Sequence, residues 1–409
     1  MERQKYCKDE HVRKIFSDVE AIRADIYKKL DAGVALTAAD VREIVNYYVF
    51  SDVRKKEEEE ARAKAEEEER AKRVTLRQYM DQFREDAKAG RRLTEKGTRY
   101  APGTLNAINQ TCERLKKFEA SKGHVYDFDE IDMNFYREYT AYLNEQNYSI
   151  NTTSKCLMQL KTFMMLAESE GLHQNTKYKD KRFRGTRVDV DSIYLTRQDL
   201  DKMMEVDLSG KSYGFDLARD IFMVGVWTAQ RVSDYNNIRP EDIETYTKRM
   251  IVDIPDPENP GKTIEKIEKR EVHIINIRQK KTGTKVAIPC SSELLRILQK
   301  YNFDIPHLSD QNINDNIKKV AEWAGLTEMV KITSTKGGRP AILEVPKYQL
   351  VHSHTARRTG ATLMYLSGMD VFDIMKITGH STPGMLKKYI KADELDVVDK
   401  ILDKYNYFD

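Results

Sequence analysis

The sequence predicts a mainly helical protein of the α+β class with two domains, and three observations lead to this prediction. Apolar residues recur every three or four positions over much of the 409 residues, as they do in amphipathic helices. A small β-sheet is indicated by alternating residues around 272–288. A strongly basic segment, residues 177–187, separates a helical region from a mixed one. The length also favours more than one domain, because domains commonly contain about 150 residues.

The overall composition excludes several classes of protein. The 69 Lys and Arg residues nearly balance 66 Asp and Glu, so the net charge of +3 excludes a uniformly basic DNA-coating protein. Hydrophobic residues make up 40% of the chain, which is enough for folded cores. No apolar run reaches the ~20 residues of a membrane-spanning helix, and the polar N-terminus lacks a signal-peptide core. The four cysteines are far apart, without a CxxC pair, so we expect a soluble protein of the reducing cytoplasm.

Residues 1–53 are predicted to be helical. Apolar residues fall at helical spacing between Val12 and Ile22, and a second helix follows Thr37. The next segment, 54–73, contains eight basic and eight acidic residues, and the acidic residue comes first in its i,i+4 pairs. Only alanines separate these charges, so the segment has no apolar stripe to bury. We predict a solvated helical spacer there, with a functional arm as the alternative.

A small helical domain is predicted over residues 74–176. One helix follows Pro102, a second covers 135–143, and a third covers 152–167 after an expected N-cap at Asn151. Nothing in this region has the pattern of a strand.

The basic segment 177–187, KYKDKRFRGTR, has two interpretations. It is either an ordinary soluble interdomain linker or a basic strap laid across a phosphate backbone, which Lys and Arg bind without reading sequence. We favour the strap, because so basic a linker is unusual in a nearly neutral protein. Its candidate DNA-binding residues are Lys177, Lys179, Lys181, Arg182, Arg184 and Arg187.

Residues 188–409 are predicted to form a mixed domain. A buried helix is expected at 215–230, and two strands, 272–277 and 286–288, are joined around the turn 280–284. Further helices are expected at 312–324, 356–367, 371–377 and 394–405.

Six polar residues of this mixed domain could carry chemistry: Arg231, Lys281, His354, Arg357, His380 and Tyr389. Each one alone has an ordinary structural explanation. Together they supply the groups needed to attack a phosphodiester without a metal. Guanidiniums bind the non-bridging oxygens, where negative charge develops. A phenol with a pKa of roughly 10 needs nearby positive charge and a base. The leaving oxygen needs a proton, which Lys or His can give.

The motifs around these residues resemble the tyrosine recombinase (phage-type integrase) superfamily. They are RVSD, KKTGT…IP, HTARRT, LSGMD, IMKITGHST and LKKYIK, spread over roughly residues 220–391. HTARRT, IMKITGH and KYIK are especially similar to integrases of mobile elements in Bacteroides-type bacteria. The most specific feature is His354-x-x-Arg357 followed by Gly379-His380 and by a tyrosine nine residues later.

The resemblance implies a SAM-like core-binding domain at 74–176 and a catalytic tyrosine recombinase domain at 188–409, which together form a C-shaped clamp on duplex DNA. In this family the residues at Arg231 and Arg357 would bind the scissile phosphate. Tyr389 would attack it and form a 3′-phosphotyrosyl link. No metal, ATP or other cofactor is implied.

The same resemblance implies the remaining roles. Lys281 would protonate the departing 5′ oxygen, His354 would be the general base or proton relay, and His380 would hydrogen-bond the phosphate. Lys280 is adjacent, and the choice of Lys281 depends on its place before Thr-Gly. The family commonly has Gly-Leu or a similar pair before its first arginine, where this chain has Ala229-Gln230.

The implied partners are double-stranded DNA attachment sites and three further copies of the chain. A homo-tetramer would form in the synaptic complex, from protein that is monomeric in solution, in the bacterial cytoplasm at the nucleoid. DNA-bending or excision proteins are accessory candidates by analogy. Residues 1–53 would be a reduced arm-type region. The apolar face of the last helix, formed by Leu395, Val398, Leu402 and Tyr405, either packs on its own domain or docks on a neighbouring protomer.

The leading hypothesis is therefore a site-specific recombinase or integrase of a mobile genetic element. A non-catalytic integrase-like DNA-binding regulator is the first alternative, although all six catalytic positions are present. A type IB topoisomerase shares the chemistry, but the separate helical domain and the tail argue against it. A zinc hydrolase built from His352, His354 and His380 lacks a convincing ligand spacing for a fourth residue.

Overall fold

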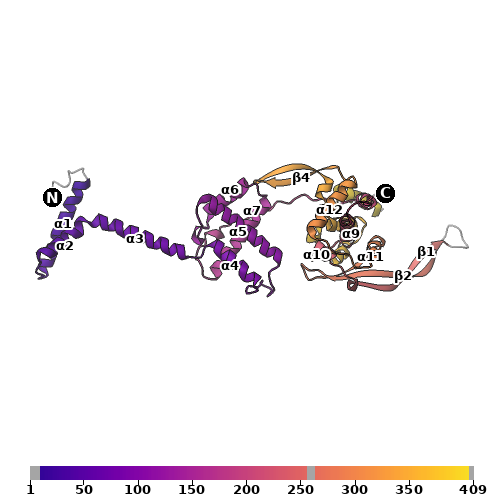
Figure 1. The fold of residues 1–409 in the computed structure, drawn as a ribbon, viewed down its shortest axis with the longest axis horizontal. Coiled ribbons are helices and arrows are strands. Elements are labelled where there is room, and N and C mark those ends of the chain that lie inside the picture. Colours follow the sequence, from indigo (N-terminus) through magenta and orange to yellow (C-terminus); the bar gives the residue numbers. More distant parts are fainter. Residues whose placement is uncertain (1–9, 256–262, 405–409) are drawn as a thin grey trace. The chain divides into compact units, whose positions relative to one another are not determined.

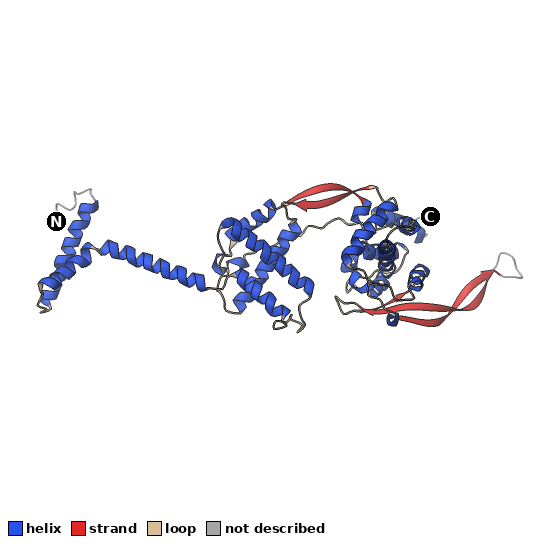
Figure 2. Ribbon diagram, in the orientation of Figure 1, coloured by secondary structure: helices blue, strands red, loops and turns tan. Residues whose placement is uncertain are grey.

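The computed structural model describes residues 10–255 and 263–404 and divides into two compact units. Unit 1 comprises Met1–Tyr142 and Ser154–Gly185, and unit 2 comprises Leu143–Thr153 and Thr186–Asp409. Helices dominate both units, and all strands of the described residues lie in unit 2 (Figures 1 and 2). The predicted α+β class is confirmed. Within the same residues, no helix is both long and apolar enough to cross a bilayer.

Unit 1 begins with two helices, α1 (Glu10–Asp31) and α2 (Ala38–Val49), as predicted. Thr37 starts α2 with a capping box: its Oγ1 accepts a hydrogen bond from the Asp40 N–H, and the Asp40 carboxylate accepts one from the Thr37 N–H. The charged segment forms the helix α3 (Ser51–Lys72), as its i,i+4 charge pairs predict. Little of this region is buried, and large apolar side chains such as Ile15, Phe16 and Val19 remain exposed.

A bundle of four helices lies mostly in unit 1: α4 (Leu76–Lys88), α5 (Pro102–Lys122), α6 (Met133–Glu145) and α7 (Ile150–Ser169). The end of α6 and the start of α7 fall in the part of the chain assigned to unit 2. Its core is rich in aromatic side chains, with Phe118 in edge or tilted contact with Phe135 and Tyr139. The predicted N-cap at Asn151 is wrong. Helix α7 starts earlier, and the Ser149 hydroxyl accepts the hydrogen bond from the Thr152 N–H.

The predicted linker at 177–187 is also wrong in its boundaries, because residues up to Gly185 are packed in unit 1. Tyr178 and Phe183, which alternate with the basic residues, are fully buried and anchor the segment. Gly185 lies so close to Ser154 that a Cβ built at Gly185 would clash with its side chain. The six basic residues are exposed, and two of them pair within unit 1, Lys179 with Glu168 and Arg182 with Asp180.

The helices of unit 2 are α8 (Arg197–Glu205), α9 (Tyr213–Thr228), α10 (Val232–Tyr235), α11 (Ser292–Lys300), α12 (Asp310–Trp323), α13 (Ser353–Leu366), α14 (Val371–Thr378), α15 (Pro383–Lys387) and α16 (Glu394–Lys404). Short 3₁₀ turns occur at Phe128–Glu130 and Lys177–Lys179 in unit 1, and at Pro240–Asp242 and Lys347–Leu350 in unit 2. Helix α9 is buried along most of its length, as predicted. Gly360 of α13 allows close contact with α9, because a Cβ there would lie 2.1 Å from the Val226 carbonyl oxygen.

Two antiparallel sheets complete unit 2. Strands β1 (Ile243–Pro255), β2 (Thr263–Arg278) and β3 (Lys285–Pro289) are ordered β1-β2-β3, and β4 (Met329–Lys336) pairs with β5 (Arg339–Pro346). The predicted strand pair is confirmed, with Ile277 opposite Val286. The first two strands continue past β3 as a long ribbon (Figure 1). This ribbon is largely exposed and the second hairpin is at most half-buried, so neither has the buried apolar face by which a strand is predicted.

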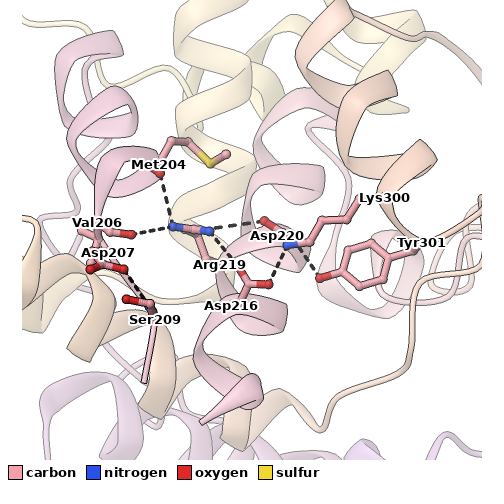
Figure 3. A network of polar contacts seen from close by, with 9 residues as sticks. All are labelled: Met204, Val206, Asp207, Ser209, Asp216, Arg219, Asp220, Lys300 and Tyr301. Atoms are coloured by element: carbon pink, nitrogen blue, oxygen red, sulfur yellow. Dashed lines mark hydrogen bonds and ion pairs between the residues drawn. The ribbon is translucent and has the colours of Figure 1, made fainter. Parts of the chain in front are cut away.

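A charged network joins α8, α9 and α11 (Figure 3). Arg219 donates to the carbonyl oxygens of Met204 and Val206, which end α8, and to the Asp216 carboxylate. The Asp220 carboxylate is buried and accepts hydrogen bonds from Lys300 Nζ at 2.6 Å and from the Tyr301 hydroxyl at 2.8 Å. This network holds the start of the buried helix α9, whose other end leads into the candidate site.

Candidate active site

Four segments of unit 2 carry the six predicted residues. Arg231 follows α9, and the chain turns there through Ala229, which has a left-handed φ of 50°. Lys281 lies in the turn between β2 and β3. His354 and Arg357 are in the first turns of α13. His380 follows α14 at the left-handed Gly379, and Tyr389 follows α15.

Arg357 is at the centre of the cluster and is fully buried. Its Nη1 donates to the Ala229 carbonyl oxygen at 2.9 Å, and its Nη2 donates to the Thr378 carbonyl oxygen at 2.8 Å. Its Nε has no hydrogen-bond partner among the described residues. Burial, and then the charge of Arg231, lower the pKa of Arg357 to about 10. A buried guanidinium that is held by carbonyl groups rather than neutralised by a carboxylate is suited to bind an anion.

His380 is buried against Arg357, with its Nε2 3.0 Å from the Arg357 Nη2. Its Nδ1 lies 2.8 Å from the Thr378 hydroxyl. Because that hydroxyl already donates its hydrogen to the Ile374 carbonyl oxygen, it accepts one from His380. His380 therefore has its hydrogen on Nδ1 and accepts from Arg357 through Nε2. Burial and the nearby guanidiniums lower its pKa to about 4, so the imidazole is neutral at pH 7.

The Tyr389 side chain lies among these groups. Its ring centroid is 5.2 Å from the Arg357 guanidinium carbon, 4.7 Å from the His380 ring and 5.3 Å from the His354 ring. Its backbone N–H donates to the Leu386 carbonyl oxygen at 2.8 Å, which ties it to α15. The structure thus brings a phenol, two imidazoles and a guanidinium together.

His354 has the environment of a neutral histidine as well. Burial and then the charge of Arg358 lower its pKa to about 4, with smaller contributions from His352, Arg357 and Arg231. Its ring stacks on that of His352, and the His354 N–H donates to the His352 Nδ1 at 3.2 Å. A neutral imidazole beside Tyr389 has a lone pair that can accept a proton.

Arg231 is held by an amide that sequence reasoning missed. Its Nη1 donates to the Gln279 Oε1 at 3.2 Å. Asp234, three residues after Arg231, does not hold that guanidinium, since its Oδ1 accepts the Lys280 N–H at 2.8 Å. No periodicity or motif in the sequence distinguishes Gln279 from other polar residues at the end of a strand.

The comparisons with known proteins match two parts of the chain. The model of the phage integrase SAM-like domain matches residues 75–184, and the model of the phage integrase family matches residues 194–395. Together these matches cover well over half of the sequence. The chain belongs to the phage integrase family. No curated protein matches it in sequence.

Solved structures of integrases share the fold of this phage integrase family member. A lambda integrase dimer bound to a COC′ core site is 17% identical with a TM-score of 0.51, over 76% of this chain and 97% of that chain. A lambda integrase tetramer bound to a Holliday junction is 16% identical with a TM-score of 0.52, over 78% of each chain. The Tn1549 transposon integrase with a circular intermediate DNA is 12% identical with a TM-score of 0.53, over 81% of this chain and 99% of that chain.

The identity of the candidate acid stays open. Lys280 and Lys281 both have exposed side chains in the turn, so the choice between them remains a prediction. The zinc alternative required His352, His354 and His380 to act as ligands. Across residues 10–255 and 263–404, no three His, Cys, Asp or Glu side chains are arranged to hold a metal ion.

Proposed function

We propose that this phage integrase family member is a site-specific DNA recombinase of a mobile genetic element and that it breaks and rejoins DNA through a 3′-phosphotyrosyl intermediate. The observation that carries the proposal is the position of Tyr389 against Arg357, His354 and His380. The motifs resemble those of integrases from Bacteroides-type mobile elements, so we assign the protein to such an element, in the bacterial cytoplasm at the nucleoid.

In this proposal the scissile phosphate binds to Arg231 and Arg357. Neither guanidinium is neutralised by a salt bridge within the described part of the chain, and each is held by neutral oxygens, of Gln279 for Arg231 and of the backbone for Arg357. The arrangement supports anion binding, because a phosphodiester supplies the negative charge that the cluster lacks. The same negative charge would raise the pKa of His380 and allow it to donate a second hydrogen bond to the phosphate.

The chemical step exchanges one ester for another. The Tyr389 Oη forms a bond to phosphorus while the bond from phosphorus to the 5′ oxygen breaks. The phenol proton passes to His354, whose pKa rises once the phosphate offsets the neighbouring guanidiniums. Lys281, or the adjacent Lys280, gives a proton to the 5′ oxygen. A 5′-hydroxyl of a second strand then attacks the phosphotyrosyl link in reverse, so no ATP, metal or other cofactor takes part.

The substrate we propose is a pair of double-stranded attachment sites, bound by four copies of a chain that is monomeric when free. The lambda integrase relatives, a dimer on a core site and a tetramer on a Holliday junction, support this assembly. The apolar residues Leu395, Val398 and Leu402 of α16 are 74%, 48% and 51% exposed, which supports docking on a neighbouring protomer. Tyr405, predicted on the same face, lies outside the described residues.

Other parts of the DNA interface remain proposals. The exposed basic residues of 177–187 are suited to phosphate contacts, although Lys179 and Arg182 would first have to release their carboxylate partners. The helical region that precedes residue 54 is the candidate arm-type region, and DNA-bending or excision proteins are candidate accessory partners.

The proposal is tested by incubating the protein with two labelled duplexes that carry the candidate attachment sites, taken from the ends of the element that encodes it. Recombinant products and Holliday junctions are expected with wild type and absent with Tyr389→Phe. Binding without either product would favour the regulator. Relaxation of a supercoiled plasmid that lacks the sites, without recombinants, would favour a topoisomerase.

A further inference from the structure

Two glutamine side chains form a buried amide pair beneath the candidate site. Gln230 and Gln279 are almost completely buried, and the Gln279 Nε2 donates to the Gln230 Oε1 at 2.6 Å. Gln230 in turn donates through its own Nε2 to the carbonyl oxygens of Thr228 and Ile377. Since both donors face carbonyl oxygens, the orientation of the Gln230 amide is determined, and its oxygen must face Gln279.

The Gln279 amide connects three segments of the site. Its Nε2 also donates to the Thr378 carbonyl oxygen at 2.9 Å, which accepts from Arg357 as well. This orientation leaves the Gln279 Oε1 to accept from the Arg231 Nη1 at 3.2 Å and from the Thr282 Oγ1 at 2.8 Å. One amide oxygen therefore contacts both a candidate phosphate-binding guanidinium and the turn that carries the candidate acid.

The backbone at Gly379 leaves room for this amide. Gly379 has a left-handed φ of 72°, and a Cβ on it would lie 2.5 to 2.7 Å from the atoms of the Gln279 amide. The glycine therefore provides the space in which the amide lies. Arg231 and Arg357 both lower the pKa of His354 and of His380, so the two positive charges act on the same small volume. The two guanidiniums repel each other. The Gln279 Oε1, which is neutral and fixed, accepts a hydrogen bond from Arg231 and keeps it in place against this repulsion.

We propose that Gln279, oriented by Gln230, is a positioning residue that holds Arg231 and the turn 280–282 in a single geometry for cleavage. The proposal rests on the proposed function. It states how the phosphate-binding Arg231 and the candidate acid in the turn 280–282 are held in fixed positions relative to each other. Gln279 contacts neither the substrate nor the reacting atoms. It acts through Arg231 on phosphate binding and through Thr282 on the delivery of the proton to the 5′ oxygen.

The test separates these two effects with two substrates. One is an ordinary nicked suicide duplex, and the other has sulfur in place of the bridging 5′ oxygen at the scissile phosphate. A thiolate leaves without being protonated, so cleavage of the sulfur substrate does not need the acid. Single-turnover rates of adduct formation are measured for wild type, Gln279→Met, Thr282→Val and the control Gln311→Met. Gln311 is exposed on α12 and bonds only to Asp315 among the described residues.

We expect Thr282→Val to slow cleavage of the oxygen substrate by about 10-fold or more and to restore the wild-type rate on the sulfur substrate. Gln279→Met should cost about 100-fold on the oxygen substrate and recover only in part on sulfur, because Arg231 is also released. Gln311→Met should match wild type on both. Equal losses of a variant on the two substrates, or no loss in either variant, would overturn the proposal.

Two further arms keep the outcome interpretable. Thermal unfolding and DNA binding show whether Gln279→Met is folded. If it is not, Thr282→Val, which removes one hydroxyl from an exposed turn, still tests whether the bond to Gln279 is needed for proton delivery. Failure of the proposed function has a different signature, because wild type would then form no adduct with either substrate.

Discussion

At the scale of single residues, the candidate site concentrates positive charge and leaves its imidazoles neutral. Arg357 is buried without a carboxylate partner, and the pKa values of His354 and His380 are lowered to about 4. A site with these properties is incomplete until an anion binds. The sequence supplies the residue types, but the neutral state of the histidines follows from burial, which the sequence does not reveal.

Replacing Arg357 by Lys tests whether the fork of the guanidinium is needed. Arg357 bonds two carbonyl oxygens at once and still presents a free Nε, whereas a lysine has one compact ammonium group. We expect Arg357→Lys to slow adduct formation by about 100-fold or more while DNA binding in a gel-shift assay changes little. Near-normal cleavage by this variant would show that charge alone is sufficient at this position.

The neutral histidines predict a pH dependence of stability. In the folded protein the pKa of both histidines is about 4, below the ordinary value of 6.5 expected in the unfolded chain. The unfolded chain therefore takes up protons first as the pH falls. Their contribution to stability is complete above pH 6.5 and is lost between pH 6.5 and 4. In urea titrations at pH 7.5, 6.5 and 5.5, the double variant His354→Gln/His380→Gln should lose less stability than wild type. Parallel losses in both proteins would contradict the assignment.

At the scale of elements, helices were predictable and exposed strands were not. Periodic apolar residues predicted α5, α9 and α12 to within a few residues. Most of the β1–β2 ribbon is exposed, and the hairpin β4–β5 has no fully buried residue, so neither has the long apolar face that identifies a strand in sequence. The segment 177–187 was misread for a related reason: its basic residues are exposed, but Tyr178 and Phe183 are core residues.

The charged network of Figure 3 makes a prediction about α9. Asp220 is buried and bonds Lys300 and Tyr301, so Asp220→Asn should lower the free energy of unfolding by about 2 kcal/mol. The matched change Asp201→Asn, in the exposed pair with Arg197 on α8, should cost less than about 0.5 kcal/mol. Urea unfolding measures both. A cost at Asp220 no larger than that at Asp201 would mean that the network does not stabilise α9.

At the scale of the whole molecule, the boundary between the two family matches agrees with the boundary between the two compact units. The SAM-like match ends at residue 184 and the integrase match begins at 194, while unit 1 ends at Gly185. The sequence located this division only approximately, because the residues that anchor the segment before it are aromatic residues within a basic run. The proposed four-protomer assembly comes from the family resemblance and from the apolar face of the last helix, not from composition. That face is exposed on α16, which supports the proposal.

That face predicts a separation of cleavage from assembly. Changing Leu395, Val398 and Leu402 together to Asp should leave adduct formation on a single site largely intact, because these side chains are exposed and lie outside the cluster around Tyr389. The variant should fail to form the four-protomer complex on a Holliday junction, as measured by light scattering. The control Asp399→Asn changes an exposed residue of the same helix. A complete tetramer from the triple variant would exclude this face as the contact.

The central claim, that Tyr389 is the nucleophile, is tested most directly by trapping the covalent intermediate. Wild type and Tyr389→Phe are incubated with a nicked suicide duplex of the candidate site in EDTA, resolved on a denaturing gel, and the adduct is digested for mass spectrometry. The account predicts an adduct with wild type alone and a nucleotide attached to the peptide that contains Tyr389. An adduct that persists in Tyr389→Phe, or a modified residue elsewhere in the chain, would contradict it.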